Sequence, residues 1–266
     1  MTLSLQPIAD PSAPLARRNP VAKLAAAMLF SLPLLATLDP LTPAIALAIE
    51  LAAAPFFGVR YSTLAKRAWP VLVASLGLLV TMVLFSANRT GTLLLDLGPF
   101  DVTTGVLTSA LGLILRLFAV AVPGVLVFAT TDPTDLADAL VQNAKAPARF
   151  AIGALAAFRL LPLLGTEWQM LTLARRARGI DAGKNPIAAV RLFVSTAFAL
   201  LVGALRRGGR LAVAMDARGF DSGVPRTHAR KQTFHPADTA LVTGAVLLSA
   251  TTLAVTIALG LFRPII

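Results

Sequence analysis

The chain of 266 residues has no cysteine, and only 14% of its residues are charged. Without cysteine it can form neither a disulfide framework nor a thiolate metal site. The shortage of charge has the larger consequence. Hydrophobic residues make up 56% of the chain and the mean hydropathy is +0.77, which lies outside the usual balance of soluble domains. We therefore expect an integral membrane protein.

Aromatic residues are also scarce, at 6% of the chain. A nucleic-acid surface that interleaves basic and aromatic side chains is therefore not expected. A phosphate-binding loop is missing as well, because the only Gly-Lys pair, Gly183-Lys184, is followed by Asn185 and has Arg178 where the motif needs its first glycine. We expect no ATP hydrolysis, no metal and no cofactor in this chain.

Apolar runs predict where the chain crosses the membrane, since a helix needs about 20 apolar residues to span about 30 Å of hydrocarbon. Five such runs, the first of them short, lie at 24–38, 41–59, 68–88, 102–131 and 239–262. The second run contains Glu50 and the fourth contains Arg116. Because an isolated charge inside a span is costly, we expect these two residues to pair with each other or with a polar partner surface.

The basic residues are concentrated in one segment. Residues 145–231 hold 15 of the 24 basic residues and four of the 13 acidic ones, so this segment accounts for the whole formal net charge of +11. Positive residues near spans favour the cytoplasmic side. We expect this segment, and the N-terminus with Arg17-Arg18, to face the cytoplasm. No cleavable signal peptide is expected.

Three helices are expected in the basic region. A short one starts at Asp132-Pro133, and a metal site formed by its three aspartates is the less favoured interpretation. Two longer helices, at about 148–178 and 187–218, begin with apolar halves of about 14 residues, which are too short to span. A transmembrane hairpin formed by these two helices would place basic residues outside, and we reject it.

The most informative feature is a duplication. Residues 159–183 and 199–223 share nine identities in 25 positions, and both contain Ala-Arg-Gly, at 177–179 and 217–219. Glycine is typical just after a helix, and arginine interacts favourably with the helix dipole there. Capping alone does not account for a duplication. We expect two exposed arginines between small residues, where another protein can offer a carboxylate.

Three segments around these tripeptides carry a family resemblance. Residues 158–164 read Phe-Arg-Leu-Leu-Pro-Leu-Leu, residues 174–179 read Ala-Arg-Arg-Ala-Arg-Gly, and residues 214–220 read Ala-Met-Asp-Ala-Arg-Gly-Phe. Over about residues 105–221 the chain resembles the transmembrane T component of energy-coupling factor (ECF) transporters. The resemblance implies an all-α integral membrane protein with about five transmembrane helices and a cytoplasmic or interfacial set of three coupling helices, two of them long.

The resemblance also implies a domain organisation and a set of site residues. The domains are an N-terminal membrane domain with four spans (1–130), a coupling-helix region (131–236) and a last span (237–266). The residues that dock onto ATPases are Ala177, Arg178, Gly179, Ala217, Arg218 and Gly219. The residues in supporting roles are Arg159, Glu167 and Arg116. Arg159 and Glu167 share a helix face and are expected to brace the neighbouring coupling helix.

The implied function is that of a non-catalytic subunit in the bacterial cytoplasmic membrane. It links two cytoplasmic ATP-binding cassette ATPases to a membrane S component, which binds a vitamin or a transition-metal ion for uptake. A stand-alone secondary transporter or channel is the alternative. The repeat is direct and cytoplasmic rather than inverted around the membrane midplane, which disfavours that alternative.

Overall fold

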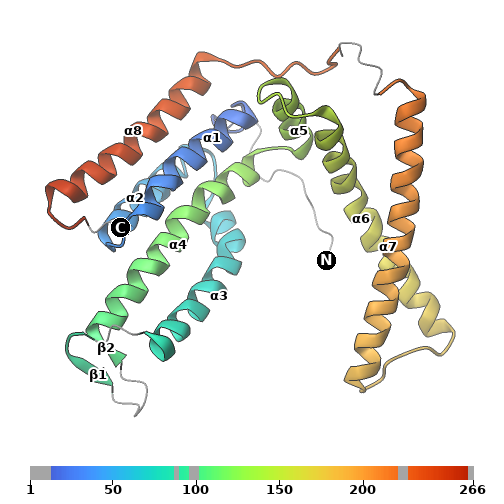
Figure 1. Cartoon of the computed structure of the whole chain (residues 1–266), viewed down its shortest axis with the longest axis horizontal. Coiled ribbons are helices and arrows are strands. Elements are labelled where there is room, and N and C mark those ends of the chain that lie inside the picture. Colours follow the sequence, from blue (N-terminus) through green and yellow to red (C-terminus); the bar gives the residue numbers. More distant parts are fainter. Residues whose placement is uncertain (1–12, 87–89, 96–101, 221–226, 263–266) are drawn as a thin grey trace. The chain divides into compact units, whose positions relative to one another are not determined.

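The computed structural model describes residues 13–86, 90–95, 102–220 and 227–262. Tertiary contacts divide this part of the chain into two units, one of residues 147–231 and the other of residues 13–146 together with 232–262. Figure 1 shows the helices of both. Each unit is described by itself below.

The larger unit, which we call the membrane unit, is a helical bundle with one small β-hairpin. Its elements are α1 (Pro20–Ser31), the 3-10 helix η1 (Leu32–Ala36), α2 (Leu41–Ala53), α3 (Tyr61–Phe85), β1 (Leu93–Leu95), β2 (Val102–Thr103), α4 (Thr104–Thr130), α5 (Pro133–Gln142) and α8 (Pro236–Ala258). The last helix packs closely on the first, although more than 200 residues separate them in sequence (Figure 1).

Small and hydroxyl-bearing side chains allow α1 and α8 to approach each other. Ala22, Ala26 and Phe30 form a buried stripe on α1 at a spacing of four residues. The Ser249 hydroxyl on α8 donates a hydrogen bond to the Phe30 carbonyl at 3.3 Å. Close contact through small residues and hydroxyl groups is typical of helix pairs in membranes, where the hydrophobic effect does not drive helices together.

A buried carboxylate joins the starts of the same two helices. Asp238 is 1% exposed and accepts hydrogen bonds from the backbone N–H groups of Asn19, at 3.0 Å, and His235, at 2.8 Å. The second of these bonds belongs to a capping box at the start of α8. Asp238 therefore satisfies free donors at both helix starts and holds them together.

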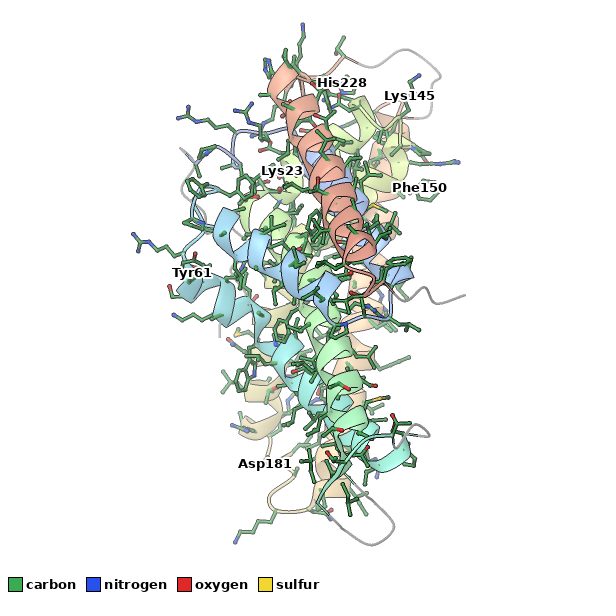
Figure 2. All side chains as sticks on the ribbon, turned by 90° about the vertical axis from the view of Figure 1, so that its left-hand side faces the viewer. Lys23, Tyr61, Lys145, Phe150, Asp181 and His228 are labelled. Carbon is green, nitrogen blue, oxygen red and sulfur yellow. The ribbon has the colours of Figure 1, made fainter. Side chains whose placement is uncertain are left out.

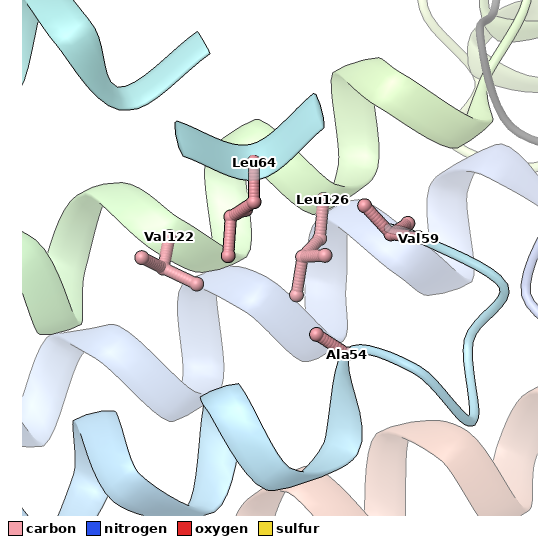
Figure 3. Close-up of a cluster of buried hydrophobic side chains, with 5 residues drawn as sticks. All are labelled: Ala54, Val59, Leu64, Val122 and Leu126. Atoms are coloured by element: carbon pink, nitrogen blue, oxygen red, sulfur yellow. The ribbon is translucent and has the colours of Figure 1, made fainter. Parts of the chain in front are cut away.

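The central helices α2, α3 and α4 meet around a cluster of buried aliphatic side chains (Figure 3). Its members are Ala54, Val59, Leu64, Val122 and Leu126. They come from the end of α2, the connection to α3, the first turn of α3 and the last third of α4. Burying an aliphatic side chain of this size stabilises a fold by about 1.5–3 kcal/mol in water, an upper limit for a cluster that faces lipid.

Two aspartates accept hydrogen bonds near the starts of helices, and the sequence predicts the first of them. Asp132 accepts a hydrogen bond from the Thr134 N–H at 2.6 Å and precedes Pro133, the first residue of α5. Asp39 accepts bonds from both the N–H and the hydroxyl of Thr42, at 2.7 and 2.6 Å, and so closes the turn before α2. Capping thus explains Asp132, and within the described ranges no three His, Cys, Asp or Glu side chains gather as a metal site.

The smaller unit is a pair of long helices, α6 (Ala148–Ala177) and α7 (Pro186–Ala217), joined by an eight-residue connection. In Figure 2 the label of Phe150 lies in the first turn of α6, and that of Asp181 lies in the connection that follows this helix. Late residues of α6 contact early residues of α7, so the helices run antiparallel. The two long helices predicted at about 148–178 and 187–218 are confirmed to within two residues.

The membrane spans need one correction. Five helices are long and apolar enough to cross a membrane, namely α3, α4, α6, α7 and α8. The expected number is the same, but the members differ, because α1 and α2 have only 12 and 13 residues. The expectation that the apolar parts of α6 and α7 are too short to span is wrong by length and composition, since each helix contains an apolar stretch long enough to cross.

Candidate docking sites at two helix ends

The two Ala-Arg-Gly tripeptides end α6 and α7 with the same backbone geometry. Arg178 caps α6 with φ −90° and ψ 9°, and Arg218 caps α7 with φ −91° and ψ 11°. The next residues, Gly179 and Gly219, have φ of 73° and 71°. A residue with a Cβ rarely adopts this left-handed conformation, which explains why glycine follows each arginine.

Matching hydrogen bonds close both ends. The N–H of Ile180 donates to the carbonyl of Arg175 at 3.0 Å, and the N–H of Phe220 donates to the carbonyl of Met215 at 3.1 Å. Each glycine N–H donates to a carbonyl three residues earlier, at 2.9 Å in both copies. This pair of bonds is the Schellman motif. The duplicated sequence therefore folds into duplicated ends. Asp221 and Gly223, also shared by the repeats, lie outside the described residues.

All six residues predicted to dock are exposed: Ala177, Arg178, Gly179, Ala217, Arg218 and Gly219. Within the described residues neither tripeptide arginine hydrogen-bonds to a carboxylate. A guanidinium group carries five N–H donors in a planar fork, and the neighbours on both sides are too small to shield it. Each end can therefore place its fork against an acidic group of another protein.

The two helices meet at one ion pair. Arg207 of α7 forms a bidentate bridge to Glu167 of α6, with Nη2 to Oε2 at 2.6 Å and a second contact between Nη1 and Oε1. Glu167 thus contacts the neighbouring long helix, and its supporting role in docking stays a prediction. Arg159, two turns earlier on α6, is exposed, and the structure describes no contact of its side chain with α7.

A second group of contacts holds the end of α6 against α7. The Arg175 Nη1 donates to the hydroxyls of Thr196, at 2.6 Å, and Ser195, at 2.7 Å, and to the Leu192 carbonyl at 3.2 Å. The rings of Trp168 and Phe193 pack with their centroids 5.1 Å apart. These contacts border a cavity of about 210 Å³ beside the first helix end.

Arg175 and Arg207 have roles that the sequence did not reveal. Both lie within residues 105–221, over which the chain resembles the family, but their partners are on a different helix, and no local spacing predicts them. Arg116 lies in the middle of α4 and belongs to the membrane unit, whereas the residues at the two helix ends belong to the smaller unit.

The mutual ion pair, one of the two arrangements expected for Glu50 and Arg116, is not formed. Both carboxylate oxygens of Glu50 are buried without a hydrogen-bond partner. Glu50 instead lies near the end of α2, where it lines an apolar cavity of about 250 Å³ in the membrane unit.

Comparison with known proteins agrees with this geometry. The chain matches the CbiQ family, described as cobalt transport protein, over residues 11–229. It is 29% identical over 201 residues to the energy-coupling factor transporter transmembrane protein EcfT 1 of Listeria monocytogenes, covering 73% of this chain and 75% of the relative. It is 30% identical over 192 residues to the EcfT of Exiguobacterium sibiricum, covering 69% and 72%.

A third relative is larger. A putative ABC transporter ATP-binding protein of Bifidobacterium longum is 28% identical over 249 residues, which cover 90% of this chain but 31% of that protein. The fold and the apolar helices define the class as a multi-pass, all-α membrane protein of a transport system. The family match extends over most of the chain, so the chain belongs to the CbiQ family. It is the transmembrane T component of an energy-coupling factor transporter.

Proposed function

We propose that this T component couples two cytoplasmic ATP-binding cassette ATPases to a membrane S component, and that Arg178 and Arg218 are the points where the ATPases dock. The observation that carries the proposal is the pair of equal helix ends, each with an exposed arginine between small residues. The chain lacks a phosphate-binding loop, so the energy of ATP must come from other subunits.

The spacing of the two ends supports two docking subunits rather than one. Each arginine lies 11 residues beyond the Glu167–Arg207 contact, which corresponds to about 16 Å of helix. Because the helices are antiparallel, the two arginines lie on opposite sides of that contact, about 30 Å apart along the pair. The Bifidobacterium relative, an ATP-binding protein with a stretch similar to this chain, also supports an ATPase as the partner.

The arrangement also suggests a route for mechanical coupling. When ATP draws the two ATPases together, the grooves that hold the arginines approach each other and displace α6 and α7. Those helices pass the displacement to the membrane unit and to the S component, which selects a vitamin or a transition-metal ion. In this proposal 1–130 is the N-terminal membrane domain, 131–236 the coupling region and 237–266 the last span.

Both helix ends must then lie on the cytoplasmic side, together with the N-terminus. A spanning hairpin of α6 and α7 would place Lys184 and Arg191 on the outer side, against the preference of basic residues. Because the chain has no cysteine, single cysteines can test this directly. We expect Lys184→Cys and Ala214→Cys to react with a membrane-impermeant maleimide only in inside-out vesicles. Reaction of the two sites from opposite sides would disprove the arrangement.

Docking is tested by removing both guanidinium groups. Truncating one partner of a buried interfacial charge pair costs about 2–5 kcal/mol. We therefore expect Arg178→Ala with Arg218→Ala to abolish copurification of the ATPases and substrate uptake in cells. Arg206→Ala, which removes an exposed arginine away from both ends, is the control and should retain both. Unchanged ATPase association in the double variant would refute the docking role.

A further inference from the structure

The two sequence repeats touch each other at equivalent positions. Glu167 and Arg207 are 40 residues apart, which is the offset of the repeat, and they form the bidentate ion pair at which α6 and α7 meet. Each lies 11 residues before the arginine that ends its own helix. The contact point is therefore equidistant from Arg178 and Arg218.

Self-contact of this kind is a property of two-fold symmetry. When two copies of one element are related by a two-fold axis, a residue on the axis meets its own counterpart, and every other residue meets a different one. Two identical carboxylates or two identical guanidinium groups on the axis would repel each other. A glutamate in one repeat and an arginine in the other convert this repulsion into attraction.

We propose that the Glu167–Arg207 pair lies on a local pseudo-two-fold axis of the α6–α7 pair and fixes the spacing of its two ends. A surface of this kind fits a partner made of two like subunits that are themselves related by a two-fold axis. The inference rests on the proposed function for the identity of the partner, but the spacing itself is a property of this chain alone.

The ion pair controls this spacing because it is the contact that ties the second half of α7 to α6. A bidentate guanidinium–carboxylate contact restricts orientation as well as distance. Beyond it, the described contacts between the helices lie on one side only, between the end of α6 and the first half of α7. Without the ion pair the second half of α7 has no described link to α6, and its end can move independently.

The test measures the distance between the two ends in the full chain, reconstituted in lipid nanodiscs without ATPases. Spin labels on Lys184→Cys and Ala214→Cys report it by pulsed electron spin resonance, and the absence of native cysteine removes background labelling. We expect one narrow distance peak. Glu167→Gln or Arg207→Gln should abolish that peak in favour of a broad distribution, whereas Arg206→Gln, next to the ion pair, should leave it narrow.

Exchange of the two charges provides the decisive variant. Glu167→Arg combined with Arg207→Glu keeps the pair in the opposite sense and should restore the narrow peak. A narrow peak in both single Gln variants, or a broad peak in the exchanged variant, would overturn the proposal. The docking role is tested separately. If the ATPases stay bound to the double variant Arg178→Ala with Arg218→Ala, the docking role is refuted, but the distance result still holds.

Discussion

The two copies of the repeat end in the same backbone geometry but differ in the side-chain contacts that hold them against the neighbouring helix. The segment from Glu167 to Arg178, which we call the first arm, is anchored to α7 through Arg175 and through the stacking of Trp168 on Phe193. The segment from Arg207 to Arg218, the second arm, has no described side-chain contact with α6 beyond the ion pair of Arg207 itself. The residues equivalent to Trp168, Gln169 and Arg175 are Gly208, Gly209 and Met215.

This difference shows which parts of the duplicated element were kept equal. The helix caps agree within about 2° in φ and ψ, so the ends present their arginines in the same way. The flanking side chains differ, so one arm has further contacts beyond the ion pair and the other is held only at the ion pair. A braced end binds without first being ordered, whereas a free end loses conformational freedom on binding. We therefore expect two equal docking geometries of unequal stiffness.

The largest expected effect separates the two ends by single substitutions. Arg178→Ala and Arg218→Ala should each weaken ATPase binding by about 2–5 kcal/mol, with the larger loss at the braced end, because that end spends less of its contact energy on ordering. Measuring the affinity of each purified variant for the ATPases gives the two losses of binding free energy. Arg210→Ala, an exposed arginine within the second arm, is the control. Equal losses at the two ends would remove the functional difference between the arms.

The sequence predicted the two helix ends well because the residues that determine each cap are adjacent in the sequence. A glycine that must adopt φ near 70° and an arginine one residue before it are visible in any sequence, and a duplication makes them conspicuous. The start of α5 at Asp132 is equally local. The long helices were also predictable, because apolar and basic residues follow one another without a breaking turn.

The side-chain pairs were harder to predict, because they depend on how helices pack. Glu167 was expected to brace a neighbouring helix, but its partner Arg207 was identified only by the structure. Glu50 and Arg116 looked like partners, since both are charges within apolar runs. In the fold the carboxylate of Glu50 has no described hydrogen-bond partner, and Glu50 lines an apolar cavity. Hydropathy alone does not contain this information.

A smaller effect is expected when the first arm is made like the second. Arg175→Met removes three hydrogen bonds to α7, and bonds from a charged donor contribute about 1.5–3 kcal/mol each at most. Backbone amides at 176–183 should then exchange hydrogen faster, which mass spectrometry of the full chain measures. The reverse change, Met215→Arg, should leave exchange at the second end unaltered, because no acceptor is described beside it. Unchanged exchange after Arg175→Met would show that the first arm is not braced there.

The smallest effect concerns the stiffness of the second arm itself. A Cβ at Gly208 or at Gly209 would meet no atom within 4 Å, so alanine fits at both positions, and each change should stabilise the helix by about 0.5–1 kcal/mol. Gly165→Ala, which adds a methyl group to equally open space in α6 before the ion pair, is the matched control. With both glycines of the second arm replaced, amides at 208–217 should exchange more slowly, and Arg218→Ala should become as costly for ATPase binding as Arg178→Ala. If the two losses stay unequal while exchange slows, helix stiffness does not distinguish the arms, and the side-chain bracing by Arg175 must account for the difference.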